Sequence, residues 1–235
     1  MGKDIWQGRL LTEEEIIDTF EKKHKAVWFH DGDPQKPHIK LNEVLCTSAF
    51  FNCSRALQHP ALCKLLASQL VRKLKPELEE MEIKKVDMVI CSSESAITLS
   101  YEVASILGAV HSFVEKDLWP LPTDINAKLM LWRKFPIPEN FRILQIEDLI
   151  VTGWNINEIR RAVNQGNPFK VNFLPIVGTI FYCPPDIRRD YRGVKIVSLV
   201  KKEVWQGFSR DCPLCKKGSE RVAPEDFWLK LTGEW

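Results

Sequence analysis

One stretch decides the fold: Ile143-Leu-Gln-Ile-Glu-Asp-Leu-Ile-Val-Thr-Gly-Trp-Asn155. A short apolar run ends in two adjacent carboxylates, Glu147 and Asp148, and a Thr-Gly turn then leads into an amphipathic helix. Amides at such a turn and at a helix N-terminus face anions, and carboxylates accept hydrogen bonds from sugar hydroxyls. This order predicts a sugar-phosphate site, with the phosphate among the amides of residues 150–155 and the Thr152 hydroxyl. The alternative interpretation is an acidic turn that interacts only with the helix dipole.

Strands and helices alternate on both sides of this stretch. Apolar runs predict strands over residues 86–91, 110–114, 129–132, 171–180 and 195–200. Helical spacing of apolar residues predicts helices after Pro60, over 96–107 and from the Thr-Gly turn to about Gly166. Such alternation is typical of βαβ units, so we expect an α/β fold with a Rossmann-like, mainly parallel sheet flanked by helices. Ligands of such sheets bind beyond the carboxyl ends of the strands.

Composition narrows the class of protein. The 235 residues are 45% hydrophobic and 27% charged, which is typical of a globular chain with one large domain or one domain with additions. The net charge of +2 argues neither for nor against a nucleic-acid partner, but no dense basic run occurs, so we expect no such partner. No secretory segment and no window of about 18 apolar residues is present, so we expect no membrane partner. The seven cysteines are odd in number and mostly scattered, which favours reduced thiols in a cytoplasmic protein.

A second polar loop follows the strand predicted at residues 86–91. Its hydroxyls, from Ser92, Ser93 and Ser95, and its amides are candidates to bind a diphosphate. The alternative is an ordinary strand-to-helix N-cap, because serine is favoured there. Glu94 adds a charge of the wrong sign for a diphosphate.

Two adjacent aromatic residues, Phe50 and Phe51, precede Asn52. One of these rings is a candidate to stack on a base. The alternative is a strand with one ring buried and the other turned outward.

The segment after residue 200 is expected to be a tail with a Cys212-Pro-Leu-Cys215 turn. Its spacing is that of half a zinc knuckle, but a structural zinc site normally needs four ligands. No second CxxC or HxxxH pattern occurs, and no histidine follows His111. Three interpretations stay open: a structural turn, which we expect with no metal, a zinc half-site, and a redox pair.

The chain resembles the type I phosphoribosyltransferases, and most closely the orotate phosphoribosyltransferase group and its uncharacterised relatives. The opening stretch is similar to their strand, acidic pair and Thr-Gly turn. The other matching segments are Ser48-Ala-Phe-Phe-Asn52, Tyr101-Glu-Val-Ala104, Glu115-Lys116, Lys128-Leu-Met-Leu-Trp-Arg133 and Asp211-Cys-Pro-Leu-Cys215.

The resemblance implies a phosphoribosyltransferase domain over residues 1–200, with a small N-terminal hood at about 1–58, and a tail over 201–235. It implies an enzyme that transfers phosphoribosyl from 5-phosphoribosyl diphosphate to a nucleobase. The implied base is pyrimidine-like, and orotate is one candidate. The implied assembly is a homodimer. Mg²⁺ is implied as the cofactor, carried mainly by the diphosphate substrate. The implied catalytic residues are Glu147, Asp148 and Lys116. The implied substrate-binding residues are Ile150, Val151, Thr152, Gly153, Trp154, Asn155, Ser92, Ser93, Ser95, Phe50 and Phe51.

This sequence also departs from the family pattern. Val151 replaces the first threonine of the phosphate turn, and Trp154 and Asn155 replace the glycine and serine after it. The diphosphate loop lacks its usual glycines, and an arginine that contacts the orotate carboxylate in part of the family aligns with Asn157. A loop at residues 118–127, expected to be mobile, lacks the family's Lys-x-His-Gly pattern. These differences favour an alternative function, a non-catalytic protein of the same fold that binds a nucleotide or a phosphoribosyl ligand.

Overall fold

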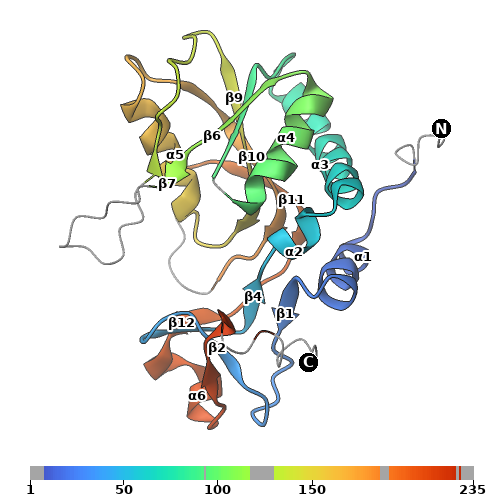
Figure 1. Ribbon diagram of the computed structural model, residues 1–235, viewed down its shortest axis with the longest axis vertical. Helices are drawn as coiled ribbons and strands as arrows, with labels where there is room; N and C mark the ends of the chain where they lie inside the picture. Colours follow the sequence, from blue (N-terminus) through green and yellow to red (C-terminus); the bar gives the residue numbers. More distant parts are fainter. Residues whose placement is uncertain (1–7, 93, 117–129, 186–190, 226–227, 229–235) are drawn as a thin grey trace.

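Five parallel strands form the central sheet in the order β11-β10-β9-β5-β6 (Figure 1). The computed structural model describes residues 8–92, 94–116, 130–185, 191–225 and 228. Ser93 and the loop expected at residues 118–127 lie outside the described residues. The strands are β5 (Met88–Cys91), β6 (Val110–Phe113), β9 (Arg142–Ile150), β10 (Asn172–Tyr182) and β11 (Lys195–Lys201). The α/β fold with a parallel sheet, expected from the sequence, is confirmed.

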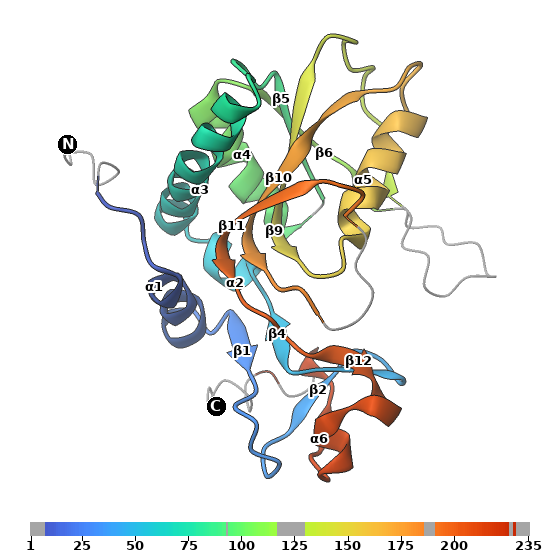
Figure 2. The ribbon, with the colours of Figure 1, turned by 180° about the vertical axis from the view of Figure 1, so that it is seen from behind.

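Helices cover both faces of this sheet, as burial of an all-parallel sheet requires (Figures 1 and 2). On one face lie α1 (Glu13–Asp18), which continues as the π-helix η2 (Thr19–Lys23), α3 (Pro60–Glu80) and α4 (Ser95–Leu107). Leu70 and Leu99 pack there with Ile146 of β9 in the largest hydrophobic cluster. On the other face lies α5 (Trp154–Gln165), whose Ile159 packs with residues of β5 and β9.

Strand β9 extends beyond the end that the sequence predicts. Its ladder with β10 continues through Glu147↔Thr179 to Ile150↔Tyr182, so the acidic pair lies inside the strand rather than after it. The predicted strand end at Ile146 is therefore wrong, because pairing with β10 outlasts the apolar run. The ladder is irregular between Phe173 and Val177, around Pro175, because proline has no N–H to donate.

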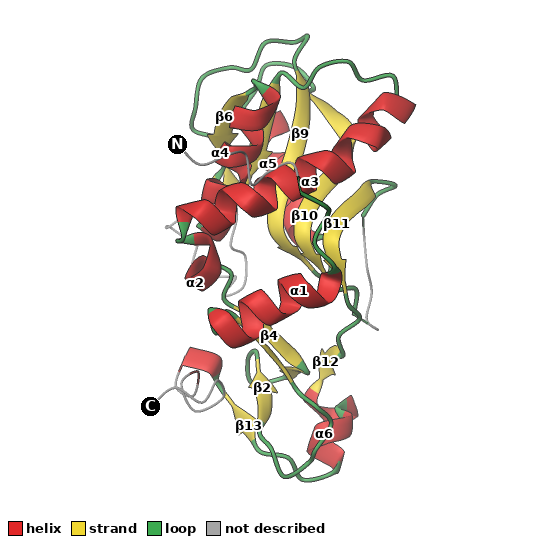
Figure 3. Cartoon of the chain, turned by 90° about the vertical axis from the view of Figure 1, so that its right-hand side faces the viewer, coloured by secondary structure: helices red, strands yellow, loops and turns green. Residues whose placement is uncertain are grey.

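A smaller, hood-like part packs below the main sheet (Figure 3). It contains the antiparallel pair β1 (Val27–Phe29) and β4 (Ala49–Phe51). It also contains a sheet in the order β12-β3-β2-β13, made of β2 (His38–Lys40), β3 (Leu45–Thr47), β12 (Gln206–Phe208) and β13 (Arg221–Val222). Two of these strands come from the segment that the sequence assigns to the tail. The hood is thus built from both ends of the described chain.

The remaining elements are short. They are α2 (Ser54–Leu57), β7 (Glu115–Lys116), β8 (Met130–Leu131), the 3₁₀-helix η3 (Ser209–Asp211) and α6 (Pro213–Lys216). Within the described residues, no helix has both the length and the apolarity needed to cross a membrane.

Candidate functional site

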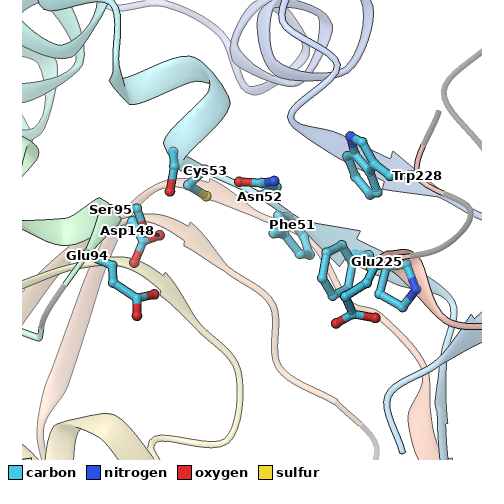
Figure 4. A pocket seen from close by; sticks show the side chains of 11 residues that line it. Phe51, Asn52, Cys53, Glu94, Ser95, Asp148, Glu225 and Trp228 are labelled. Atoms are coloured by element: carbon cyan, nitrogen blue, oxygen red, sulfur yellow. Dashed lines mark hydrogen bonds between the residues drawn. The ribbon is translucent and has the colours of Figure 1, made fainter. Parts of the chain in front are cut away.

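The carboxyl end of the central sheet faces the hood, and a cavity of about 430 Å³ lies between them (Figure 4). Residues from β4, the start of α4, the end of β9 and the C-terminal segment line this larger cavity: Phe50, Phe51, Asn52, Cys53, Ser54, Glu94, Ser95, Asp148, Pro224, Glu225 and Trp228. Asp148 and Ser95 lie at one side of it and Trp228 at the other (Figure 4).

A smaller cavity of about 170 Å³ lies at the turn between β9 and α5, and the consecutive residues 149–156 line it. Gly153 is the N-cap of α5 with φ of 84°, a left-handed conformation that favours glycine. The N-terminal amides of a 12-residue helix therefore begin at the cavity. Trp154 is 44% exposed, so much of its indole lies in solvent, beside the turn. All six residues predicted to surround an anion, residues 150–155, line this cavity.

Glu147 is fully buried beneath the larger cavity and lines neither cavity. Its carboxylate accepts hydrogen bonds from the Ser92 backbone N–H at 3.1 Å and from the Ser92 hydroxyl at 2.7 Å. Burial, strengthened by the charge of neighbouring Asp148, raises the pKa of Glu147 to about 8. Glu147 thus ties the loop between β5 and α4 to β9.

Asp148 is the member of the pair that reaches the larger cavity, where it is partly exposed. The Ser95 hydroxyl donates to its Oδ2 at 2.5 Å, and the thiol of Cys53 lies against the same carboxyl group. Burial raises the pKa of Asp148, and these hydrogen bonds oppose the rise. Both serines of the second loop that the structure describes therefore hold the acidic pair.

The backbone of this second loop is strained at Glu94, which has φ of 71° although it is not glycine. Its side chain lines the larger cavity and pairs with Lys116, whose Nζ lies 2.5 Å from Glu94 Oε1. Non-glycine residues in such conformations are frequent at ligand sites, so this loop is a candidate part of the site. Lys116, predicted as catalytic, is thus brought to the edge of the cavity by an ion pair.

The two adjacent aromatics have different surroundings. Phe51 packs against the core rings of Phe181 and Phe29, with centroid distances of 5.1 and 5.6 Å. Phe50 lies edge-on to Trp228, with centroids 5.4 Å apart. Both phenylalanines line the larger cavity, which therefore has an aromatic wall on the hood side.

Sequence reasoning missed two parts of the site. Trp228 and Glu225 come from the segment predicted as a tail. Next to the acidic pair, the Gln145 side-chain amide donates a hydrogen bond from Nε2 to Glu147 Oε1 at 3.4 Å. Its Oε1 accepts a hydrogen bond from Arg160 Nε of α5 at 3.2 Å. A polar Gln145 inside the apolar run was the available signal for this buried network. Burial lowers the pKa of Arg160 to about 10.

Solved structures share this architecture. The orotate phosphoribosyltransferase of Aeropyrum pernix superposes with a TM-score of 0.51 over 79% of this chain and 93% of that one, at 12% identity. The chain therefore has the fold of the type I phosphoribosyltransferases.

Curated relatives are similar along nearly the whole chain, although no protein-family model matches the sequence. An orotate phosphoribosyltransferase of Pelotomaculum thermopropionicum is 28% identical over 218 residues, covering 91% of this chain and 97% of that protein. An orotate phosphoribosyltransferase of Desulforamulus reducens is 27% identical over 214 residues, with coverage of 91% and 97%.

The buried carboxyl group of Glu147 makes stability depend on pH. Native Glu147 keeps its proton up to about pH 8, whereas an unfolded glutamate loses it near 4.5, so stability falls as pH rises through this interval. Glu147→Gln keeps a neutral side chain of the same shape, so it should lose less stability between about pH 5 and about pH 8, by a few kcal/mol. Urea unfolding at both pH values measures the difference. The exposed Glu139→Gln is the control, and parallel pH profiles for the wild type and Glu147→Gln would contradict the assignment.

Proposed function

We propose that the protein is a phosphoribosyltransferase. It transfers the phosphoribosyl group of 5-phosphoribosyl diphosphate to a ring nitrogen of a pyrimidine-like base, with orotate one candidate among several. The observation that carries this proposal is the position of Asp148. It lines the larger cavity and directly precedes, along β9, the residues that line the smaller one. One carboxylate therefore stands between a pocket suited to a phosphate and a pocket suited to a ribose and a base.

In this proposal the smaller cavity takes the 5-phosphate. Backbone amides from residue 150 onward and the N-terminus of α5 supply donors and a favourable dipole. The Thr152 hydroxyl adds a donor. Because Trp154 is 44% exposed at the rim of this cavity, its bulk is compatible with a phosphate held by the backbone.

The larger cavity then takes the ribose and the base. Asp148 accepts hydrogen bonds from ribose hydroxyls, and the aromatic wall of Phe50 and Trp228 offers contact to a planar ring. The base nitrogen forms the new bond to the anomeric carbon while the carbon–oxygen bond to diphosphate breaks. The proton on that nitrogen leaves to solvent or to a carboxylate. Positive charge develops on the ribose ring, and the fixed carboxylate of Asp148 stabilises it in a partly dehydrated site.

Mg²⁺ prefers oxygen ligands and usually keeps several waters, with one or two carboxylates and substrate phosphates completing its shell. The larger cavity fits this preference, because Asp148, Glu94 and Glu225 place carboxylates around it. When bound with the diphosphate, the ion would neutralise the charge of the leaving group. Asp148 and Glu94 are the residues that we propose to hold it.

The contacts of the second loop, residues 92–95, favour a second function. The described serine hydroxyls donate to the acidic pair, and the anionic Glu94 lines the same cavity, where it would repel a diphosphate. These contacts favour a protein that binds a nucleotide or ribose 5-phosphate without turnover. Catalysis requires Glu94 to exchange its partner Lys116 for the Mg²⁺ of the diphosphate complex, so turnover and binding have to be measured separately.

Replacement of Asp148 tests the transfer reaction. Asp148→Asn removes the charge that stabilises the developing cation, so kcat/KM should fall by about 100-fold or more. Diphosphate release is measured with 5-phosphoribosyl diphosphate, Mg²⁺ and a panel of orotate, uracil, cytosine and purine bases. Glu158→Gln, on α5 and paired with Arg161, is the matched control that should keep full activity. A folded wild type that is silent across the panel but binds ribose 5-phosphate would establish the second function.

Two substitutions in the turn test the phosphate site. Thr152→Val removes a hydrogen bond to a charged group and should weaken ribose 5-phosphate binding about 10-fold. Trp154→Ala removes a partly exposed side chain and should change affinity less than about threefold. Isothermal titration calorimetry measures both. The assignment fails if the two variants bind as tightly as each other or if Trp154→Ala is the weaker.

We also propose that the protein is a homodimer that pairs through α4 and β6. Tyr101, Ile106 and Val110 are exposed there by 60%, 41% and 46%, on a helix and on the edge strand of the sheet. Tyr101→Glu should convert a dimer to a monomer in light scattering, while Leu41→Glu in the hood should not. A wild-type monomer at micromolar concentration would refute this assembly.

A further inference from the structure

The hood brings together four residues that are far apart in sequence. His38 of β2 and Cys46 of β3 lie beside Cys212 and Cys215, which flank the start of α6. Their potential ligand atoms all lie within 4.8 Å of one another. Cys46 is separated from Cys215 by 169 residues and His38 by 177. Local spacing could not reveal this group, because His38 and Cys46 lie far from the CxxC turn in sequence.

Three distances between the potential ligand atoms are close to those of a tetrahedral metal site. Bonds of about 2.3 Å to sulfur and about 2.0 Å to nitrogen place neighbouring ligand atoms roughly 3.5 to 3.8 Å apart. Cys46 Sγ lies 3.8 Å from Cys215 Sγ. His38 Nε2 lies 3.5 Å from Cys212 Sγ and 3.3 Å from Cys215 Sγ. A disulfide needs sulfurs about 2.05 Å apart, and all seven cysteines are free thiols in this structure.

We propose that His38, Cys46, Cys212 and Cys215 bind one structural Zn²⁺. Three thiolates and one imidazole close the tetrahedral shell, which leaves no open position for chemistry. On binding, the three thiols release their protons to solvent and the imidazole stays neutral. The proposal is independent of the phosphoribosyl transfer.

The tautomer of His38 is already the one that such a site requires. The Ser219 hydroxyl donates its only hydrogen to the Lys36 carbonyl at 2.7 Å. It lies 2.8 Å from His38 Nδ1 and therefore accepts a hydrogen bond from Nδ1–H. The lone pair of a neutral imidazole is then on Nε2, which faces the sulfurs of Cys212 and Cys215. Metal-bound histidines are commonly oriented by a partner of this kind on the other nitrogen.

Two further groups suit the negative charge of a three-thiolate site. The Cys215 backbone N–H donates to Cys212 Sγ at 3.4 Å. The Arg221 guanidinium lies beside Cys46, and its Nε is a buried donor for which no partner is found among the described residues. A zinc-bound thiolate at Cys46 would place a strong acceptor next to this donor.

Around these four residues the hood has only a small hydrophobic cluster and short strands. The local hydrophobic cluster consists of Cys46, Cys212 and Leu214, with Trp205 and Cys215 packed against it. The strands of this sheet are only two or three residues long. A metal that joins β2 and β3 to the C-terminal segment would fix β13, which leads directly to Pro224 and the wall of the larger cavity (Figure 3). Small parts with small cores commonly use a metal in this way.

Metal content tests the proposal. The full-length protein is expressed with zinc in the medium, and loosely bound metal is then removed. Elemental mass spectrometry should find about one zinc per chain. Cys215→Ser should lose most of it. Cys63→Ser, a buried cysteine outside the group, is the matched control and should retain it. Ser219→Ala should weaken zinc binding about 10-fold while leaving all four ligands in place.

Two measurements keep the test decisive if Cys215→Ser does not fold. Cobalt-substituted wild-type protein should show tetrahedral Co²⁺ bands with sulfur charge-transfer absorption. A zinc chelator should accelerate amide exchange in β2, β3 and β13 but not in β9 and β10. A wild type without stoichiometric zinc that takes up no Co²⁺ would overturn the proposal. A disulfide between Cys46 and Cys215 in the fresh protein, or equal zinc in Cys215→Ser and Cys63→Ser, would overturn it as well.

Discussion

The site depends on two carboxylates held at the carboxyl end of one buried strand. Glu147 has no contact with solvent, so its charge or its proton must be accommodated by the protein. Ser92 does this with its backbone N–H and its hydroxyl, and the Ser95 hydroxyl donates a hydrogen bond to Asp148. These hydrogen bonds tie the loop before α4 to β9. They fix the direction of Asp148 and thereby the relation between the two cavities.

The second constraint is that the larger cavity is closed by the hood. The central sheet supplies Asp148 and the start of α4, but the aromatic wall comes from Phe50 and from Trp228 near the C-terminus. The hood sheet pairs β13 with β2 and β12 with β3, so both ends of the described chain are needed to form this wall. Packing in the hood therefore controls the shape of the larger cavity, although no hood strand carries the acidic pair.

Much of the central domain could be predicted from local sequence. The apolar runs and the spacing of leucines indicate the parallel sheet and its helices, and the Thr-Gly turn indicates the smaller cavity. The end of β9 was predicted too early, because a carboxylate inside a buried strand is tolerated only when a distant partner such as Ser92 binds it. Periodicity carries no information about such a partner.

The hood could not be predicted in the same way. Its strands are two or three residues long, and β2 pairs with β13, more than 180 positions later in the chain. For the same reason, Trp228 was missed at the cavity and His38 and Cys46 were missed beside the CxxC turn. Long-range pairing of short segments decides these contacts, and the local sequence around each residue does not indicate that pairing.

The central claim is that Asp148 stands between a phosphate pocket and a ribose pocket. A crystal structure with 5-phosphoribosyl diphosphate and Mg²⁺ tests it most directly. We predict that the 5-phosphate lies among the amides of residues 150–155 and that a ribose hydroxyl lies within hydrogen-bonding distance of Asp148. A phosphate bound elsewhere, or a ribose without contact to Asp148, would contradict this account.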